Sequence, residues 1–72
     1  MKAKEMFKKL GYEYSKVGEK IYYEKPNYDG HSLYVVFYTV TEQWDTNITE
    51  IKEHGELVSI IIKQIEELGW ND

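Results

Sequence analysis

The chain contains no cysteine, which excludes disulfide staples and zinc sites built from thiolates. Arginine is missing too, so nine lysines supply every basic side chain, and the formal net charge is −4. Arginine dominates the phosphate and guanine contacts of proteins that bind duplexes. The composition therefore disfavours binding to double-stranded nucleic acid.

Long apolar runs are also lacking. No run approaches the roughly 20 apolar residues of a helix that spans a bilayer. The first residues, MKAKE, are charged and lead into an amphipathic segment, unlike the apolar core of a signal peptide. Together with the absence of cysteine, this predicts a cytoplasmic protein.

Motifs for catalysis, metal binding and phosphate binding are missing as well. The five glycines are isolated, and no serine lies in a nucleophile elbow. His31 and His54 are the only histidines, and no metal-ligand spacing links them. We expect both at the surface, and we predict no enzyme, no metal and no cofactor. An enzyme would need a pocket that encloses His31 or His54 with a carboxylate.

The 72 residues predict a single domain, residues 1–72. A chain this short buries only about 60% of its unfolded surface. Without staples it needs dense aromatic packing or a partner subunit. Seven Tyr, two Trp and two Phe supply the aromatic rings. Self-association as a homodimer is the alternative.

Helical spacing is clearest in residues 56–70. One stripe carries the residues Leu57, Ile61, Ile65 and Leu68, flanked by Val58 and Ile62 on one side and by Ile60 on the other. The polar arc holds Lys63, Gln64, Glu66 and Glu67. So wide an apolar band predicts a helix wedged between a sheet and a second helix, starting near His54. Alternatively, Ile60 or Ile62 lies in a subunit contact.

Two helix ends carry the same signal. Leu68-Gly69-Trp70 places glycine where a helix commonly ends in a left-handed residue, with an apolar residue after it. Leu10-Gly11-Tyr12 repeats this pattern and predicts the end of a short amphipathic helix over residues 2–10.

Alternating side chains predict strands over residues 12–17, 20–25 and 33–41, the last with Trp44 as its furthest extent. Gly18-Glu19 and residues 27–30 are expected to form the turns between them, with Pro26 ending the second strand. Residues 45–47 predict a further turn, and residues 48–52 a short fourth strand. A rival interpretation extends the last helix back to Thr49.

The predicted fold is α+β: an antiparallel meander of three or four strands, with the N- and C-terminal helices packed on one face. The other face is open to solvent or to a partner. Leu33, Val35 and Phe37 are expected to face the helices. Tyr34, Val36 and Tyr38 then point outward, although the two faces could be exchanged.

The tyrosine-rich outer face has three interpretations. It forms a protein interface or a homodimer contact, it stacks single-stranded bases, or its rings only cover the sheet. The candidate contact residues are Tyr22, Tyr34, Val36, Tyr38 and Ile60. We predict a non-enzymatic protein-binding module. A single-stranded nucleic-acid binder is the alternative, although base stacking normally needs a cationic rim and the chain is acidic.

The short helix ending in LGY, the segment IYYEK and the helix ending in IKQIEELGW resemble small uncharacterised proteins of low-GC Gram-positive bacteria, often carried by their phages and mobile elements. The resemblance covers nearly the whole chain. Its motifs are helix-end and strand signals, and they bring no catalytic residues. It implies a cytoplasmic phage or prophage accessory protein.

Overall fold

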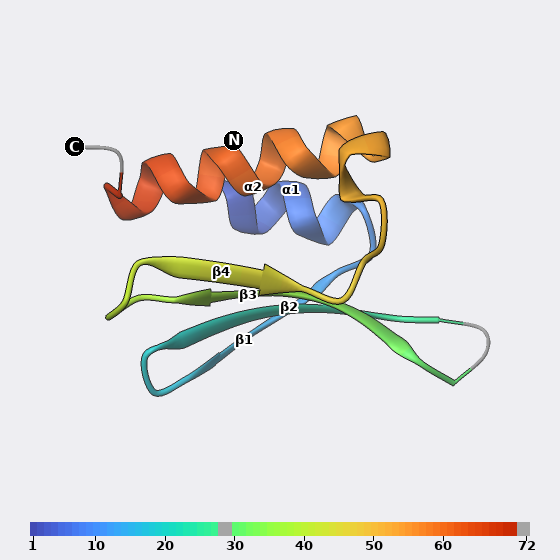
Figure 1. Cartoon of the computed structure of the whole chain (residues 1–72), viewed down its shortest axis with the longest axis horizontal. Helices are drawn as coiled ribbons and strands as arrows, with labels where there is room; N and C mark the ends of the chain where they lie inside the picture. Colours follow the sequence, from blue (N-terminus) through green and yellow to red (C-terminus); the bar gives the residue numbers. More distant parts are fainter. Residues whose placement is uncertain (28–29, 71–72) are drawn as a thin grey trace.

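A computed structural model describes residues 1–27 and 30–70. The elements in chain order are α1 (Ala3–Lys9), β1 (Glu13–Val17), β2 (Lys20–Pro26), β3 (Ser32–Tyr38), β4 (Gln43–Thr46), the 3-10 turn η1 (Ile51–Glu53) and α2 (Gly55–Leu68). The strands form one antiparallel sheet in the order β1-β2-β3-β4, and both helices lie on the same face of it (Figure 1). The predicted α+β meander is confirmed.

Both helices end with the same pattern of backbone hydrogen bonds. Gly11 and Gly69 take φ values of 92° and 77°. The N–H of Tyr12 donates to the carbonyl of Phe7 at 3.0 Å, and the N–H of Trp70 donates to the carbonyl of Ile65 at 3.2 Å. These bonds belong to the Schellman motif, in which a left-handed glycine lets the chain turn back on the last helical turn. The two predicted helix ends are confirmed.

The start of α1 is capped by the end of α2. Lys2, at the N-cap position, makes no side-chain capping bond. Instead, the Glu67 carboxylate accepts the N–H of Ala3 at 2.9 Å. A carboxylate satisfies an otherwise unpaired helix N–H and complements the helix dipole. This contact joins the two ends of the chain.

The core is a single layer between the sheet and the helices. Phe7 of α1 stacks on Tyr23 of β2 with ring centroids 3.8 Å apart, and both rings meet Phe37 of β3 edge-on. Strand register places Tyr23 beside Val35 and Ile21 beside Phe37 on this face. The buried cluster comprises Ala3, Phe7, Tyr12, Ile21, Tyr23, Val35, Phe37, Leu57, Ile60 and Ile61. The predicted inward orientation of Val35 and Phe37 is therefore confirmed.

Gln64 departs from the predicted polar arc of α2. It is only 6% exposed, and its Oε1 accepts a hydrogen bond from the Tyr23 hydroxyl. A buried hydroxyl needs a partner, and Gln64 provides it from the side of α2 that also carries Glu67. The amide is thus an internal polar contact within the core.

The boundary between β3 and β4 differs from the predicted strand over residues 33–41. β3 ends at Tyr38, residues 39–42 form a turn, and Trp44 lies in β4. The turn contains no glycine, proline or asparagine, and Glu42 takes the left-handed conformation with φ 56°. A neighbouring hairpin holds it, because the N–H and hydroxyl of Thr39 both donate to the carbonyl of Glu19, at 3.0 and 2.8 Å.

Two further predictions in this region were wrong. Asp45 and Thr46, expected in a turn, belong to β4, which is the fourth strand of the sheet. Residues 48–52, expected as that strand, instead form an irregular segment over 48–50 and the first two residues of η1. The start of α2 after His54 is as predicted. The turn predicted for residues 27–30 falls in part on residues 28–29, which lie outside the described residues.

Replacing Glu42 by glycine should stabilise the protein. A non-glycine residue in the left-handed region costs about 1 kcal/mol, part of which glycine recovers despite its greater freedom in the unfolded chain. We expect Glu42→Gly to raise the free energy of unfolding by about 0.5 kcal/mol in urea denaturation.

Thr41→Gly is the matched control, because Thr41 lies in the same turn without a positive φ. It should lower the free energy of unfolding by about 0.5–1 kcal/mol. Equal destabilisation by both variants would contradict the assigned turn.

Candidate functional site

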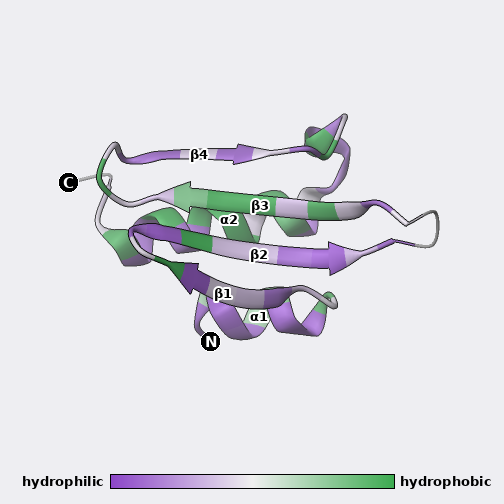
Figure 2. Ribbon diagram, turned by 90° about the horizontal axis from the view of Figure 1, so that it is seen from below, coloured by the Kyte–Doolittle hydropathy of each residue, from purple (hydrophilic) through white to green (hydrophobic). Residues whose placement is uncertain are grey.

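The outer face of the sheet carries the predicted tyrosines. Register places Val36 between Tyr22 and Asp45, Glu24 beside Tyr34, and Lys20 beside Tyr38. Within the described chain no helix or loop crosses this face, which Figure 2 shows from below. The predicted candidates Tyr22, Tyr34, Val36 and Tyr38 therefore do lie together.

Val36 is nevertheless only 1% exposed. Since no other element covers it, the side chains around it must, and Tyr22, Tyr34 and Tyr38 are themselves half-buried. This is the arrangement expected when tyrosine rings cover a sheet and keep their hydroxyls wet. A partner meets tyrosine edges here and cannot reach Val36 itself.

The charges of the outer face are mostly acidic. Glu13, Glu24 and Asp45 lie on it by register, while Lys20 places its Nζ 5.5 Å from the centroid of the Tyr38 ring. A groove that follows a nucleic-acid backbone is normally cationic. The electrostatics of this face therefore disfavour the binding of single-stranded nucleic acid.

Ile60, the fifth candidate, does not belong to an accessible surface. It is 1% exposed and lies in the core. Ile60, Gln64 and Glu67 share one side of α2 by helical spacing, and Glu67 contacts the start of α1, so this side faces α1. Ile62, the alternative considered with it, is 48% exposed.

An apolar patch lies on the opposite side of α2. Val58, Ile62 and Ile65 point away from α1 by helical spacing, toward the side of the molecule where β4 forms the sheet edge (Figure 2). Trp44 of β4 shares the helix-facing side of the sheet with Phe37 and is 39% exposed. We call Trp44, Val58, Ile62 and Ile65 the β4 flank.

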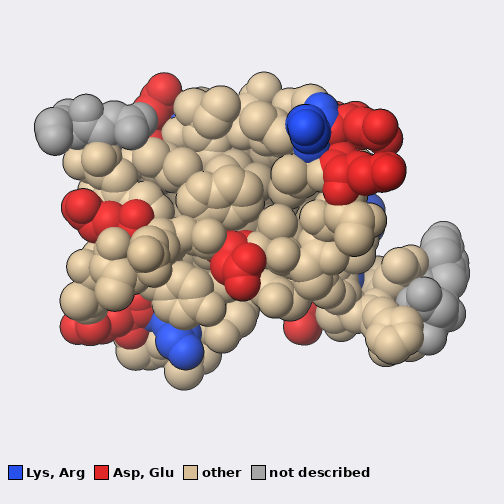
Figure 3. Space-filling model, in the orientation of Figure 1, with Lys and Arg blue, Asp and Glu red and all other residues tan. Residues whose placement is uncertain are grey.

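Figure 3 views the molecule from this side. Uncharged surface occupies most of the middle of the view, and charged side chains gather at its margins, apart from one acidic group near the centre. A depletion of charge with an exposed tryptophan is typical of the centre of a protein interface. Sequence reasoning missed Trp44 because it placed that residue at the limit of β3.

The backbone of β4 is free along one edge, because β4 pairs only with β3 within the described chain. The N–H of Thr46 donates to its own neighbour, the Asp45 carboxylate, at 2.8 Å. Along an edge strand, the backbone N–H and C=O groups of successive residues point alternately toward the neighbouring strand and away from it. Trp44, two residues before Thr46, therefore also directs its N–H and C=O away from the sheet. Such an edge can pair with another extended segment.

The side chain of Asn47 ends the ladder between β3 and β4. Its amide oxygen accepts the N–H of Tyr34 at 2.9 Å, and its amide nitrogen donates to the carbonyl of Ser32 at 2.7 Å. These two bonds replace the pair that a further strand residue would make. β4 therefore ends after four residues, and the chain then continues to η1.

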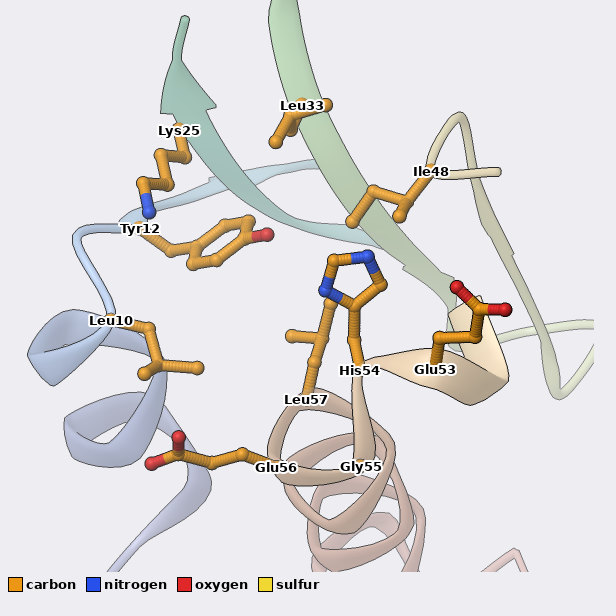
Figure 4. A pocket seen from close by; sticks show the side chains of 10 residues that line it. All are labelled: Leu10, Tyr12, Lys25, Leu33, Ile48, Glu53, His54, Gly55, Glu56 and Leu57. Atoms are coloured by element: carbon orange, nitrogen blue, oxygen red, sulfur yellow. The ribbon is translucent and has the colours of Figure 1, made fainter. Parts of the chain in front are cut away.

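A hollow of about 410 Å³ lies where the C-terminal end of α1, the N-terminal end of α2 and the sheet meet. It is lined by Leu10, Tyr12, Lys25, Leu33, Ile48, Glu53, His54, Gly55, Glu56 and Leu57. Figure 4 shows the Tyr12 hydroxyl and the His54 imidazole pointing into it. His54, Glu53 and Glu56 line the hollow but all three are exposed, so it does not enclose a histidine with a carboxylate as an enzyme would require. No hydrogen bond joins His54 to Glu53 or Glu56 in the described structure, so no acid–base pair is assembled.

Other sites receive no support. Among the described residues no group of three or more His, Asp and Glu side chains could hold a metal ion. Neither described helix has the length and apolar character needed to cross a bilayer. His31 is exposed on the segment before β3, far along the chain from His54.

Tyr23 links the core to alkaline stability. Burial raises the pKa of its hydroxyl above the ordinary value near 10, and the neighbouring Tyr14 and Glu67 add to the shift. The folded chain therefore keeps this proton after the unfolded chain has released it. The stabilisation from the protonated Tyr23 hydroxyl is fully present below about pH 10, and the free energy of unfolding should fall as the pH rises further.

Urea denaturation at about pH 8 and about pH 11 tests this effect. The wild type should lose more stability between the two than a Tyr23→Phe/Gln64→Leu variant, which removes both partners of the buried hydrogen bond and leaves neither unpaired. Equal losses would show that Tyr23 does not govern the alkaline limit.

No protein-family model matches the chain, and no curated protein or solved structure matches it. Function is therefore inferred from the geometry of the chain itself.

Proposed function

We propose that the protein is a non-enzymatic protein-binding module that binds through the β4 flank and the free edge of β4. The observation that carries this proposal is the combination of an unpaired strand edge with two exposed apolar side chains, Trp44 at 39% and Ile62 at 48%. Tryptophan is enriched among the residues that dominate interface energies. Burial of these two side chains would contribute a few kcal/mol, at about 25 cal/mol per Å².

Strand addition is the binding mode that uses both features. An extended segment paired with β4 gains main-chain hydrogen bonds, and its alternate side chains point to the two faces of the sheet. On one face they meet Trp44 and Ile62. On the other they lie at the margin of the tyrosine-covered face, so the β4 flank and that margin contribute to one contact.

The partner in this proposal is a protein segment in extended conformation. A second copy can supply it, because two β4 strands can pair antiparallel about a twofold axis. A different protein is the alternative source of the segment. The resemblance to small phage-carried proteins of low-GC Gram-positive bacteria supports a partner in the bacterial cytoplasm, either of the host or of the phage.

A single-stranded nucleic acid is the second candidate partner. Its support is the open face with three half-buried tyrosines and Lys20. Lys16 and Lys25 of the same hairpin lie by register on the helix-facing side. The acidic residues on that face, Glu13, Glu24 and Asp45, oppose it. We expect no quenching of tyrosine fluorescence by oligothymidine at low salt, and salt-sensitive quenching would favour this candidate instead.

A Trp44→Ser/Ile62→Gln variant should lose binding and keep its fold, because both side chains are exposed. Sedimentation velocity over a wide concentration range measures self-association. We expect a wild-type dimer and a monomeric variant. Val17→Ser is the matched control, since Val17 is 63% exposed on the opposite edge strand, β1, and should leave the dimer unchanged.

If the wild type is monomeric, peptide display tests whether it binds an extended segment of a different protein. Peptides selected on the wild type and counter-selected on the variant should perturb the backbone amide signals of β4. A monomer that selects no such peptide contradicts the proposal.

A further inference from the structure

The hollow at the N-terminal end of α2 contains the hydroxyl of Tyr12, which makes no hydrogen bond within the described chain. Tyr12 is only 7% exposed, and its ring packs edge-on against Phe7 with centroids 5.7 Å apart. Its hydroxyl points into the hollow (Figure 4), and no hydrogen bond joins it to another described residue. A buried tyrosine usually places its hydroxyl on a partner. Among the described residues no fully buried side-chain oxygen lacks a partner, so this hydroxyl is open to solvent from the hollow, and a ligand there would replace water as its partner.

His54 supplies a second polar group. It is the N-cap residue of α2 but makes no side-chain capping bond. Its imidazole turns into the hollow, on the same side as the Tyr12 hydroxyl (Figure 4). An imidazole and a phenol can each donate and accept hydrogen bonds. Together they form a polar end that suits one hydroxyl or carbonyl group.

The remaining walls are aliphatic. The hydroxyl and the imidazole are surrounded by Leu10 at the C-cap of α1, Leu33 of β3, Ile48 after β4 and Leu57 of α2 (Figure 4). The volume of about 410 Å³ lies within the range of roughly 300–1,000 Å³ found for small-molecule pockets. It accommodates a six-membered ring with a short substituent.

Charges around the hollow nearly cancel. Glu53 and Glu56 oppose Lys25 and the positive end of the α2 dipole, which is worth roughly half a charge. An anion would meet the two carboxylates, and a cation would meet Lys25 and the free N–H groups of the first turn of α2. The lining therefore favours a ligand without net charge.

From these features we propose that the hollow binds an uncharged, amphipathic small molecule. Its ring or short alkyl body contacts Leu10, Leu33 and Ile48. Its hydroxyl or carbonyl group is held by Tyr12 and His54. The site lies apart from the β4 flank, so it does not depend on the proposed protein contact.

Titrations followed by ¹H–¹⁵N NMR test this assignment with 4-ethylphenol as the probe. We expect saturable shifts at the amides of Leu10, Tyr12, Ile48 and Leu57. Ethylbenzene, which lacks the hydroxyl, and 4-ethylbenzoate, which carries a negative charge, should each bind about tenfold more weakly, as expected for one lost hydrogen bond or one unfavourable charge contact.

The hydroxyl is tested by Tyr12→Phe, which keeps the ring that packs on Phe7. It should weaken 4-ethylphenol binding about fivefold to tenfold. Tyr14→Phe is the control, because Tyr14 is 39% exposed and does not line the hollow. The affinity of Tyr14→Phe for 4-ethylphenol should match that of the wild type.

Three outcomes would overturn the proposal. These are shifts that do not saturate or that spread over the surface, an unchanged affinity in Tyr12→Phe, and a stronger response to 4-ethylbenzoate than to 4-ethylphenol.

Discussion

The stack of Phe7 on Tyr23 is the contact on which the rest of the structure depends. The seven residues of α1 are too few for a stable isolated helix, so α1 exists because Phe7 inserts between the sheet and α2. Tyr23 in turn fixes the rotation of α2, because its hydroxyl is bound by Gln64. Glu67, one turn further along, caps the start of α1. One aromatic pair thereby sets the position of both helices on the sheet.

Placing both helices on one face determines what remains exposed. The outer face has no covering element in the described chain, yet Val36 is buried there because tyrosine side chains surround it. The uncovered apolar surface lies elsewhere, at the edge formed by β4. α2 packs over β2 and β3 (Figure 2), so Trp44 on the next strand is only partly covered. The surface available to a partner is therefore a strand edge with its flank, more than a sheet face.

The connection from β4 to α2 gives the molecule a second distinctive region. Asn47 ends the β3–β4 ladder with its side chain, and η1 then carries the chain up to the start of α2 (Figure 1). This path runs past the end of the sheet without filling the space beside Tyr12. The hollow and the β4 flank thus arise from the same short fourth strand, one at its end and one along its edge.

The sequence by itself determined the elements whose signals are local. Leu10-Gly11-Tyr12 and Leu68-Gly69-Trp70 predict both helix ends, because a left-handed glycine and its hydrogen bonds involve only neighbouring residues. The Gly18-Glu19 hairpin and the α+β meander follow from similar short-range patterns. Tertiary structure alone decided the end of β3, since Glu42 holds its left-handed conformation in a turn anchored to Glu19 of another hairpin. It also decided that Gln64 and Ile60 are buried, because the docking of α1 selects which side of the wide apolar band of α2 faces inward. Side-chain spacing measures how wide an apolar stripe is, and only packing shows which half of it meets water.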